Sequence, residues 1–270
     1  MFTTIINDCA DDNARARQES RLASLLDTPV SFVGVRSDLE AGVQLIDILD
    51  ATGGRPGLIL VNVAPRGGHT AKWENGTPFA YFYYHKTLVV SSVDGYALAG
   101  VKKFELVTSV KLLDTHSAAA AMEAAGFVSP AAAARIPTTQ FRSFDFTPRV
   151  GAFLYNGGEV PTEEYSLTQV PNLPAAIWHI DNFGNCKTTL TTADLADERE
   201  LATRFGTLSH VGQLRNLPDS HHALVSGSSG LGDTRFLELM AQRQSFAKHH
   251  DVHIGDDIFS STSHFRQATE

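Results

Sequence analysis

Apolar residues in the first part of the chain gather into short runs, separated by polar segments and turn residues. Three of these runs, residues 2–6, 30–35 and 58–63, are rich in β-branched residues and predict strands. The segments between them predict helices over residues 14–26 and, with Asp38 as the N-cap, over residues 38–48. Alternating strands and helices are typical of an α/β domain with a mainly parallel sheet, in which ligands bind beyond the carboxyl ends of the strands.

The pattern becomes richer in strands after residue 78, with strands expected over residues 80–84, 87–90 and 96–101. The alanine-rich segment 117–135 favours helix, and Pro130 divides it into two short helices.

Three prolines and several polar residues make segment 160–174 a predicted linker. Beyond it, short apolar runs at residues 175–180, 188–190 and 223–225 predict a smaller domain built mainly from strands. We therefore expect an α/β domain over residues 1–165 and an all-β, barrel-like domain over residues 166–270.

Composition narrows the classes of partner. The chain has 270 residues, and its 43% hydrophobic and 19% charged residues exclude intrinsic disorder. Because 22 Lys and Arg stand against 30 Asp and Glu, the net charge of −8 argues against nucleic acid and anionic membranes. No run approaches the roughly 20 apolar residues of a membrane span. With only Cys9 and Cys186, and no secretory signal at the N-terminus, the expectation is a cytoplasmic protein.

Three motifs carry candidate chemistry. Asp8 closes the first strand, where a carboxylate can hold a ribose diol, although an N-cap or a solvated turn acid is equally open there. Residues 179–185 (HIDNFGN) place an acid, an aromatic ring and an amide in one turn, which suits a base and an ammonium or a plain turn with a satisfied Asx side chain. Residues 226–232 (SGSSGLG) form a small-residue loop for a carboxylate, or a flexible hairpin.

No metal site is expected from the sequence. Among eleven histidines, the pairs 221–222 and 249–250 are adjacent, and adjacent residues on a strand face opposite ways. Neither pair has a third ligand at metal-binding spacing, so surface histidines are the prediction. The aromatic run at residues 79–84 is expected in a core or a subunit interface.

The order of these landmarks resembles the S-adenosylmethionine hydroxide adenosyltransferase family, which is related to the fluorinating and chlorinating enzymes that use the same cofactor. The likeness spans about residues 3–258, and only the turn at residues 181–185 (DNFGN) is specific. The landmarks in chain order are Asp8, residues 38–42 (DLEAG), Pro65 with Gly68, Asp94 with Gly95, residues 141–148 (FRSFDFTP), residues 181–185, and residues 228–230 (SSG).

The resemblance implies an N-terminal α/β domain, a small C-terminal β-barrel, and a homotrimer that binds S-adenosylmethionine between the N-terminal domain of one subunit and the C-terminal domain of the next. By position, Asp8 would hold the ribose hydroxyls and Asp181 the methionine ammonium. The implied adenine contacts are Phe183, Asn185 and the backbone near Ser245 and Ala247; the implied carboxylate contacts are Ser228 or Ser229.

The implied reaction is attack of water on the ribose 5′ carbon, which releases methionine and adenosine. The family's water-activating residues fall here on Ala64, on Lys72 or its neighbour, and on Arg142, and neither Ala64 nor the always protonated Arg142 can act as a base. Arg66, His69 and Lys72 could instead orient an anionic nucleophile, or simply be surface residues. Arg142, Arg66 and Lys72 are the candidate catalytic residues. The alternatives are a binding protein that has lost its catalytic residues and an unrelated α/β domain.

Overall fold

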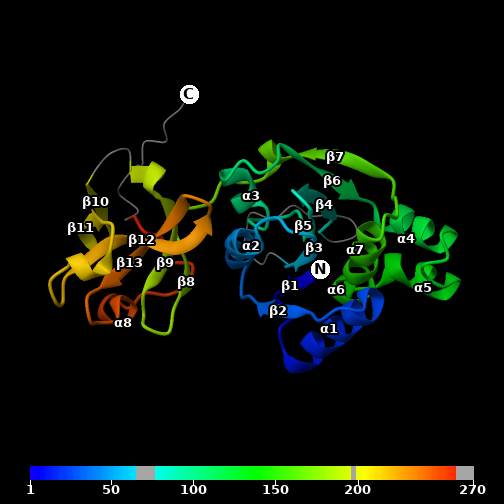
Figure 1. Ribbon diagram of the computed structural model, residues 1–270, viewed down its shortest axis with the longest axis horizontal. Helices are drawn as coiled ribbons and strands as arrows, with labels where there is room; N and C mark the ends of the chain where they lie inside the picture. The colour runs from blue at the N-terminus through cyan, green and yellow to red at the C-terminus, as the bar shows by residue number, and fades with distance from the viewer. Residues whose placement is uncertain (65–76, 196–198, 260–270) are drawn as a thin grey trace. The chain divides into compact units, whose positions relative to one another are not determined.

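The computed structural model describes residues 1–64, 77–195 and 199–259 (Figure 1). The chain divides into two compact units, Met1–Asn172 and Leu173–Glu270. The first unit is an α/β domain and the second is a β domain.

The sheet of the first unit has seven strands in its described part, in the order β2-β1-β3-β5-β4-β6-β7. Its strands are β1 (Phe2–Asn7), β2 (Ser31–Gly34), β3 (Gly57–Asn62), β4 (Phe79–Tyr84), β5 (Thr87–Ser92), β6 (Ser109–Leu113) and β7 (Thr162–Ser166). Its helices are α1 (Asp12–Leu26), α2 (Asp38–Thr52), α3 (Ala99–Lys103), α4 (Thr115–Ala124), α5 (Pro130–Arg135), α6 (Arg142–Asp145) and α7 (Thr147–Tyr155).

This sheet is mixed, which corrects the expectation of a mainly parallel one. Strands β2, β1, β3 and β5 are parallel neighbours, whereas β4 pairs antiparallel with both β5 and β6, and β6 pairs antiparallel with β7. Only His85 and Lys86 separate β4 from β5, and so short a connection permits only antiparallel pairing.

One local prediction was wrong and a second was right only in part, both for tertiary reasons; the division between the units falls inside the predicted linker, but not all of that segment is linker. Residues 96–101, predicted as a strand, form a turn and the start of α3, which packs on α2. The predicted linker 160–174 contains β7, and the Lys102 ammonium donates a hydrogen bond to the Val170 carbonyl. The first unit therefore continues to Asn172.

The N-cap of helix α2 lies one residue before the predicted one. Ser37 is the N-cap, because its hydroxyl accepts a hydrogen bond from the Glu40 N–H at 3.1 Å. The Asp38 carboxylate instead accepts a hydrogen bond from the Tyr96 N–H at 2.7 Å. Asp38 therefore anchors the turn that follows Asp94 and Gly95.

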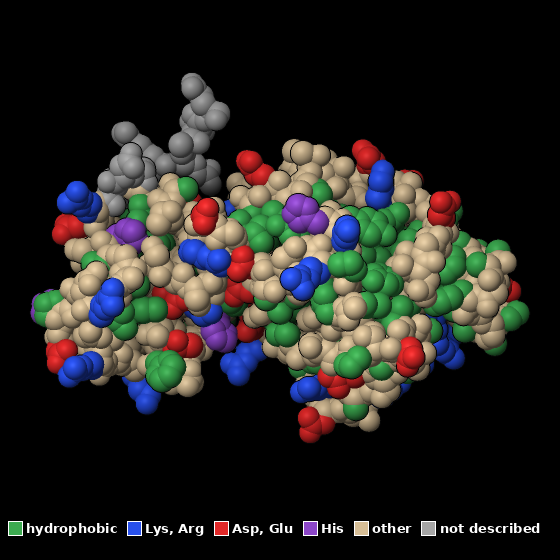
Figure 2. Space-filling view, in the orientation of Figure 1, with side chains coloured by type: hydrophobic (Ala, Val, Ile, Leu, Met, Phe, Trp, Pro, Cys, Tyr) green, Lys and Arg blue, Asp and Glu red, His purple; other side chains and the backbone are tan. Residues whose placement is uncertain are grey.

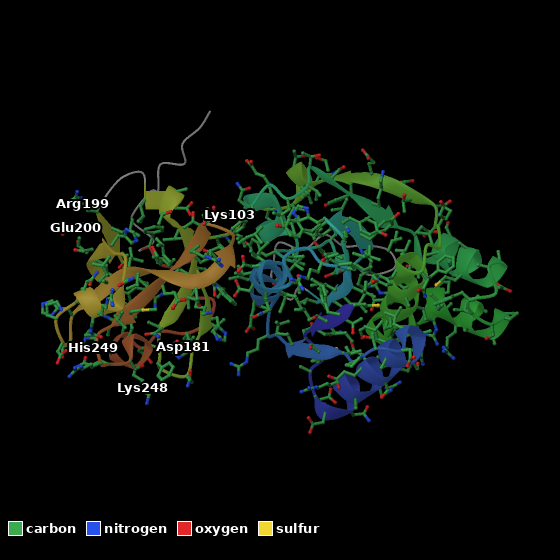
Figure 3. All side chains as sticks on the ribbon, in the orientation of Figure 1. Lys103, Asp181, Arg199, Glu200, Lys248 and His249 are labelled. Carbon is green, nitrogen blue, oxygen red and sulfur yellow. The ribbon has the colours of Figure 1, made fainter. Side chains whose placement is uncertain are left out.

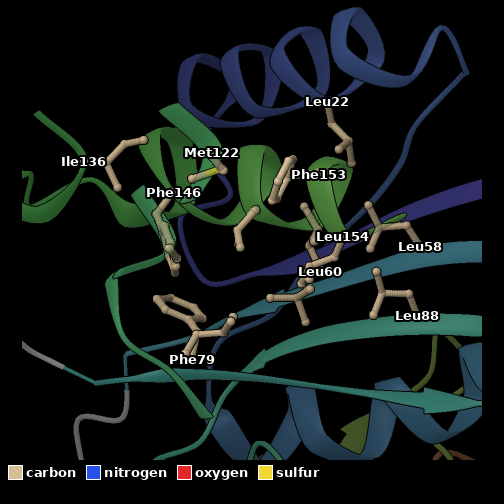
Figure 4. Close-up of a cluster of buried hydrophobic side chains, with 14 of the residues drawn as sticks. Leu22, Leu58, Leu60, Phe79, Leu88, Met122, Ile136, Phe146, Phe153 and Leu154 are labelled. Atoms are coloured by element: carbon tan, nitrogen blue, oxygen red, sulfur yellow. The ribbon is translucent and has the colours of Figure 1, made fainter. Parts of the chain in front are cut away.

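The core of the first unit lies between one face of the sheet and helices α1, α4 and α7 (Figure 4). Leu58 and Leu60 of β3 point into this core, and Leu22 reaches it from α1. The rings of Phe79 and Phe146 meet here, with their centroids 5.7 Å apart. This packing joins the start of β4 to the segment between α6 and α7.

In its described part, the second unit is a curled six-stranded sheet, a half-barrel, in the order β10-β11-β12-β13-β9-β8. Its strands are β8 (Ile177–Ile180), β9 (Cys186–Thr191), β10 (Glu200–Thr203), β11 (Gly206–Val211), β12 (His222–Leu231) and β13 (Thr234–Ala241), and its helix is α8 (Phe246–His250). Strands β11 and β12 are parallel, and the other neighbours are antiparallel. The core includes Ile177, Leu239 and Phe246, and the last of these seals α8 against the sheet.

None of the helices that the structure describes is long and apolar enough to cross a membrane. On the face seen in Figure 2, basic and acidic side chains are interspersed and do not gather by sign.

Helices α2 and α3 approach each other backbone to backbone. A Cβ added at Gly42 would collide with the Tyr96 carbonyl oxygen, and one added at Gly100 would lie 2.6 Å from the Gly42 carbonyl oxygen. Neither backbone can withdraw without moving a whole helix. This contact sets the position of the turn between β5 and α3.

We expect Gly42→Ala to lower the free energy of unfolding by about 1–3 kcal/mol, the usual cost of overpacking. In a helix without such a contact, alanine is more favourable than glycine by about 1 kcal/mol. A decrease in the free energy of unfolding would therefore come from the collision. Urea unfolding followed by circular dichroism measures the change. Gly151→Ala in α7 is the control, because its added methyl would meet only leucine side chains, the nearest being Leu60 at 2.7 Å, and a smaller effect is expected. A Gly42→Ala variant as stable as the parent protein would contradict this account.

Candidate functional site

The turn between β8 and β9, residues 181–185, is organised by the Asp181 carboxylate. Its Oδ1 atom accepts hydrogen bonds from the N–H groups of Phe183 at 2.8 Å and Asn185 at 2.9 Å. The backbone closes the same turn, since the Asp181 N–H donates to the Asn185 carbonyl at 3.0 Å. Gly184 supplies the left-handed conformation that the turn requires, with φ +84°. The Asx turn that the sequence left open is therefore present.

The second carboxylate oxygen of Asp181 orients the Asn185 side chain. Its Oδ2 atom accepts a hydrogen bond from Asn185 Nδ2 at 2.9 Å. Within the described residues, the Asn185 Oδ1 atom and the second N–H of this amide have no hydrogen-bond partner. An amide that offers one acceptor and one donor side by side matches the paired donor and acceptor on an adenine edge.

The same turn is docked on the start of α8. The Ala247 N–H donates to the Gly184 carbonyl at 2.9 Å. A Cβ at Gly184 would collide with the Ser245 hydroxyl, which caps α8 by accepting a hydrogen bond from the Lys248 N–H at 3.1 Å. Figure 3 shows Asp181 near α8, which carries Lys248 and His249. The turn and the helix thus form one rigid wall.

This wall borders a cavity of about 530 Å³ in the second unit. Its volume falls within the range of small-molecule sites. Phe183 extends at its edge with 72% of its surface exposed, more than the other exposed large hydrophobic residues in the described part of the chain, Met1, Tyr83 and Phe141. The lining residues are Phe183, Asn185, Leu214, Ala241, Gln242, Arg243, Gln244 and Ser245.

The structure thus brings together three of the predicted binding residues, Phe183, Asn185 and Ser245. Ala247 contacts the turn through its backbone and does not line the cavity. The segment at residues 242–244 was missed by the sequence analysis. Its polar side chains follow an ordinary strand, and only the packing of β13 against the turn gives them a place at the cavity.

Ser228 and Ser229 lie within β12, next to an irregularity in its pairing with β13, so the small-residue segment is part of a strand and not a loop. Ser229 is buried, and its hydroxyl accepts a hydrogen bond from the Lys187 ammonium. Ser228 is exposed, and its carbonyl accepts one from Arg235. Lys187, two residues after Asn185, is a cation that the sequence analysis missed.

A second group of polar residues lies in the first unit, where the carboxyl ends of β1, β3 and β5 meet. Asp8, Ala64 and Asp94 follow these three parallel strands. The Asp8 Oδ2 atom accepts a hydrogen bond from the Ala64 N–H at 3.1 Å. Asp8 is not an N-cap, because Asp11 caps α1 by accepting hydrogen bonds from two N–H groups.

Arg142 reaches the same edge of the sheet. Its guanidinium donates a hydrogen bond to the Thr77 carbonyl and lies 5.2 Å from the centroid of the Phe79 ring. Phe79 is paired with Ser92 at the end of β5, which fixes the edge that Arg142 approaches. Burial lowers the pKa of Arg142 from its ordinary value, although a guanidinium stays protonated at neutral pH.

The short helix α6, which carries Arg142, is held by a buried carboxylate at its other end. Asp145 forms ion pairs with Arg135 at 3.0 Å and Arg149 at 3.3 Å. Although burial alone would raise it, the pKa of Asp145 lies below its ordinary value, because Thr139 and the two arginines stabilise the charged form. The predicted residues Arg66 and Lys72 lie outside the residues that the structure describes.

Two further observations concern reactive side chains. Burial raises the pKa of the Cys186 thiol to about 12, so this residue stays a thiol at neutral pH. Of the four paired histidines predicted to lie at the surface, His221 and His249 are exposed, whereas His222 and His250 are half-buried. His249 and His250 lie on a helix and not on a strand, and together with His222 they form a cluster.

The comparisons with known proteins establish only the fold. No protein-family model and no curated protein matches the sequence. An uncharacterized conserved protein from Thermotoga maritima is 14% identical, with a TM-score of 0.64 over 94% of this chain and 98% of its own. A conserved hypothetical protein from Thermus thermophilus is 16% identical, with a TM-score of 0.59 over 94% of this chain and 96% of its own. The chain therefore shares its two-unit fold with structures of uncharacterised proteins.

Proposed function

We propose that the second unit binds the adenosyl group of S-adenosylmethionine, with the adenine base in the cavity beside Phe183. The observation that carries this proposal is the exposed Phe183 ring next to the Asn185 amide, which Asp181 holds in one orientation. A flat heteroaromatic base would cover the ring and remove its apolar surface from water. The amide would then pair with the edge of the base.

Preorganisation of the amide is the main physical argument for adenine. A free Asn side chain would lose rotational freedom on binding, whereas the Asp181 carboxylate has already restricted the Asn185 amide before any ligand arrives. The Asn185 Oδ1 atom would accept from the exocyclic amino group, and its second N–H would donate to the neighbouring ring nitrogen. Guanine and hypoxanthine present an oxygen in place of that amino group and would be rejected.

The methionine end of the ligand would take its partners from residues outside the cavity lining. In this proposal the methionine ammonium is held by Asp181, whose negative charge also favours the sulfonium. Because this carboxylate already accepts three N–H groups, its main duty is to position Asn185, and one lone pair remains for the ammonium. The methionine carboxylate would take the Lys187 ammonium and the Ser229 hydroxyl as partners.

The proposed reaction is displacement at the ribose 5′ carbon with water as the nucleophile. The water oxygen forms a bond to this carbon while the carbon–sulfur bond breaks. The electron pair of the carbon–sulfur bond passes to sulfur. The products are methionine, adenosine and a proton that is released to solvent. Because methionine leaves uncharged, the step needs a positioned and partly desolvated nucleophile more than an acid.

We further propose a homotrimer in which Asp8 of one subunit holds the ribose hydroxyls of a ligand bound by the second unit of the next subunit. The half-exposed Asp8 carboxylate stands at the carboxyl ends of parallel strands, where α/β folds bind nucleosides. Tyr83 and Phe141 are large apolar side chains with 51% and 66% of their surface exposed, as expected of residues that a partner covers. Figure 2 shows hydrophobic side chains over much of the first unit on the face in view.

A second candidate function is binding of the nucleoside without turnover. Two observations favour it, namely the methyl side chain of Ala64 where a proton acceptor is needed, and the Arg142 guanidinium, which is engaged by the Thr77 carbonyl. In that case the protein would report on the concentration of S-adenosylmethionine or adenosine.

We expect Phe183→Ala to weaken the binding of adenosine, measured by isothermal titration calorimetry, by about 5- to 150-fold. This is the range of roughly 1–3 kcal/mol that stacking of one base supplies. Phe183→Tyr keeps a ring of the same size and is the control that should bind nearly as well as the parent protein. Adenosine should bind more tightly than inosine, and Asn185→Ala should remove this preference. Equal affinities for the two nucleosides in the parent protein would refute the role of Asn185.

Incubation with S-adenosylmethionine followed by chromatography should yield adenosine and methionine in equal amounts. In water labelled with ¹⁸O, the label should appear at the 5′ hydroxyl of adenosine, since the solvent oxygen forms the new bond. Asp8→Ala should abolish this product if the ribose is held as proposed. Tight binding without product would establish the binding protein instead, and the absence of heat with S-adenosylmethionine, adenosine and methionine would exclude both functions.

The composite site is tested by mixing two variants that are defective for different reasons, at an S-adenosylmethionine concentration too low to occupy the weakened Phe183→Ala site. Asp8→Ala and Phe183→Ala subunits, dissociated and reassembled together, should regain about a quarter of the parent sites, because a random trimer pairs intact halves at that frequency. Product formation by the mixture measures the recovery, with each variant reassembled alone as the control. A mixture as inactive as its components, or a protein that is monomeric by light scattering, would overturn the subunit-bridging arrangement.

A further inference from the structure

The second unit holds a histidine cluster that the proposed function does not use. His222 opens strand β12, and His249 and His250 end helix α8, so the three residues come from two separate elements. One ring nitrogen from each lies within 4.8 Å of the others. We propose that His222, His249 and His250 bind a divalent transition-metal ion, with zinc as the ion that fits best.

The three imidazole rings form an almost regular triangle. Their centroids are 4.6 Å apart for His222 and His249, 4.8 Å for His222 and His250, and 4.7 Å for His249 and His250. The rings meet edge to face, with interplanar angles between 67° and 79°. The three rings therefore surround a shared space and do not stack on one another.

One pair of nitrogens is already close to the spacing of a tetrahedral site, and all three nitrogens lie within 4.8 Å of one another. Zinc binds imidazole nitrogen at about 2.0–2.1 Å, which places neighbouring ligand nitrogens roughly 3.3–3.4 Å apart. His250 Nε2 and His222 Nδ1 are 2.9 Å apart and share a hydrogen bond. A metal ion would replace the proton between them after the two rings separate by a few tenths of an ångström. Rotation of the exposed His249 side chain would complete the set.

Electrostatics favours the neutral rings that a metal requires. Burial and the charges of neighbouring histidines lower the pKa of His222 and of His250, since positive charges so close repel one another. Metal ions bind the deprotonated nitrogen of neutral imidazole.

The donor set selects the class of ion. The cluster offers imidazole nitrogen alone within the described part of the chain, without a carboxylate or thiolate. Nitrogen donors suit zinc, nickel and copper, whereas calcium and magnesium take oxygen ligands. Three protein ligands leave a fourth position, which faces solvent on the exposed side of His249. A water molecule or a small anion would occupy it.

Aromatic packing holds the cluster in place. Phe246, fully buried in the core, contacts the His250 ring at 4.4 Å and the His222 ring at 5.3 Å, measured between centroids. Phe205, in the turn before β11, contacts the His250 ring at 5.5 Å. These contacts limit the freedom of two ligands before a metal arrives, which reduces the entropic cost of binding. A bound ion would tie the start of β12 to the end of α8.

The test uses the protein without a histidine tag, stripped with a chelator and then titrated with zinc by calorimetry. We expect saturable binding of one ion per chain and an increase in the melting temperature, because the ion binds the folded state. Titration with cobalt(II) should give the intense visible absorption of a four-coordinate site, and zinc should abolish it.

His249→Gln is the decisive variant, because this side chain is exposed and its loss should leave the fold intact. Zinc affinity should fall by more than the roughly 10- to 100-fold that the loss of a supporting residue around a metal costs. His222→Gln and His250→Gln should have the same effect. His221→Gln and His253→Gln are matched controls, since both are exposed histidines outside the cluster, and should bind zinc as the parent does.

Three results would overturn the proposal: the absence of saturable zinc binding, an affinity that His249→Gln leaves unchanged, or an equal loss in the control variants. The outcome does not depend on the adenosyl site, because Phe183→Ala should retain full zinc binding.

Discussion

The candidate site depends on one carboxylate. Asp181 gathers two backbone N–H groups and the Asn185 amide around itself, and these three hydrogen bonds convert five residues of irregular chain into a turn with one conformation. Only because this turn is closed can Gly184 approach Ser245 and accept the Ala247 N–H. Hydrogen bonds to an ionised acceptor are the stronger ones, so a charged residue is used where rigidity matters. The exposure of Phe183 is a consequence of this geometry, since the closed turn projects its ring outward.

The first unit uses a different constraint. Its central parallel strands are buried on both faces, and this burial aligns their carboxyl ends at one edge of the sheet. Asp8 directly follows β1 and Asp94 lies two residues after the end of β5, whereas Arg142 comes from helix α6 and contacts the Thr77 carbonyl and the Phe79 ring. The close contact of Gly42 with the Tyr96 backbone sets the neighbouring turn. The edge formed by the carboxyl ends of the parallel strands therefore brings together side chains that are far apart in the chain.

The pattern of hydrophobic and polar residues within a segment predicted those helices and strands that form because of their own sequence. Residues 2–6 and 58–62 lie in strands whose apolar residues are mostly buried, and residues 31–34 form a strand that is only partly buried beside β1. The alanine-rich segment 117–135 forms two helices divided near Pro130. The pattern gave the wrong prediction where contacts with other helices or strands determine the conformation of a segment. Residues 96–101 have enough apolar character for a strand, yet Gly100 fits against α2 only as part of a helix, and segment 160–174 gains a strand because β6 offers a free edge. The sheet is mixed for the same reason, since pairing partners are not encoded locally.

The amino-acid sequence by itself determined the α/β and β composition of the two units and the chemistry of the turn at residues 181–185, because both follow from residues adjacent in the chain. Tertiary structure alone decided which distant residues meet. It placed Ser245 beside Asn185, Lys187 beside Ser229, and His222 beside two histidines that follow it by 27 and 28 residues. A side chain's neighbours across a sheet or on a packed helix depend on how whole elements bury their apolar faces, and that choice is made by the entire core.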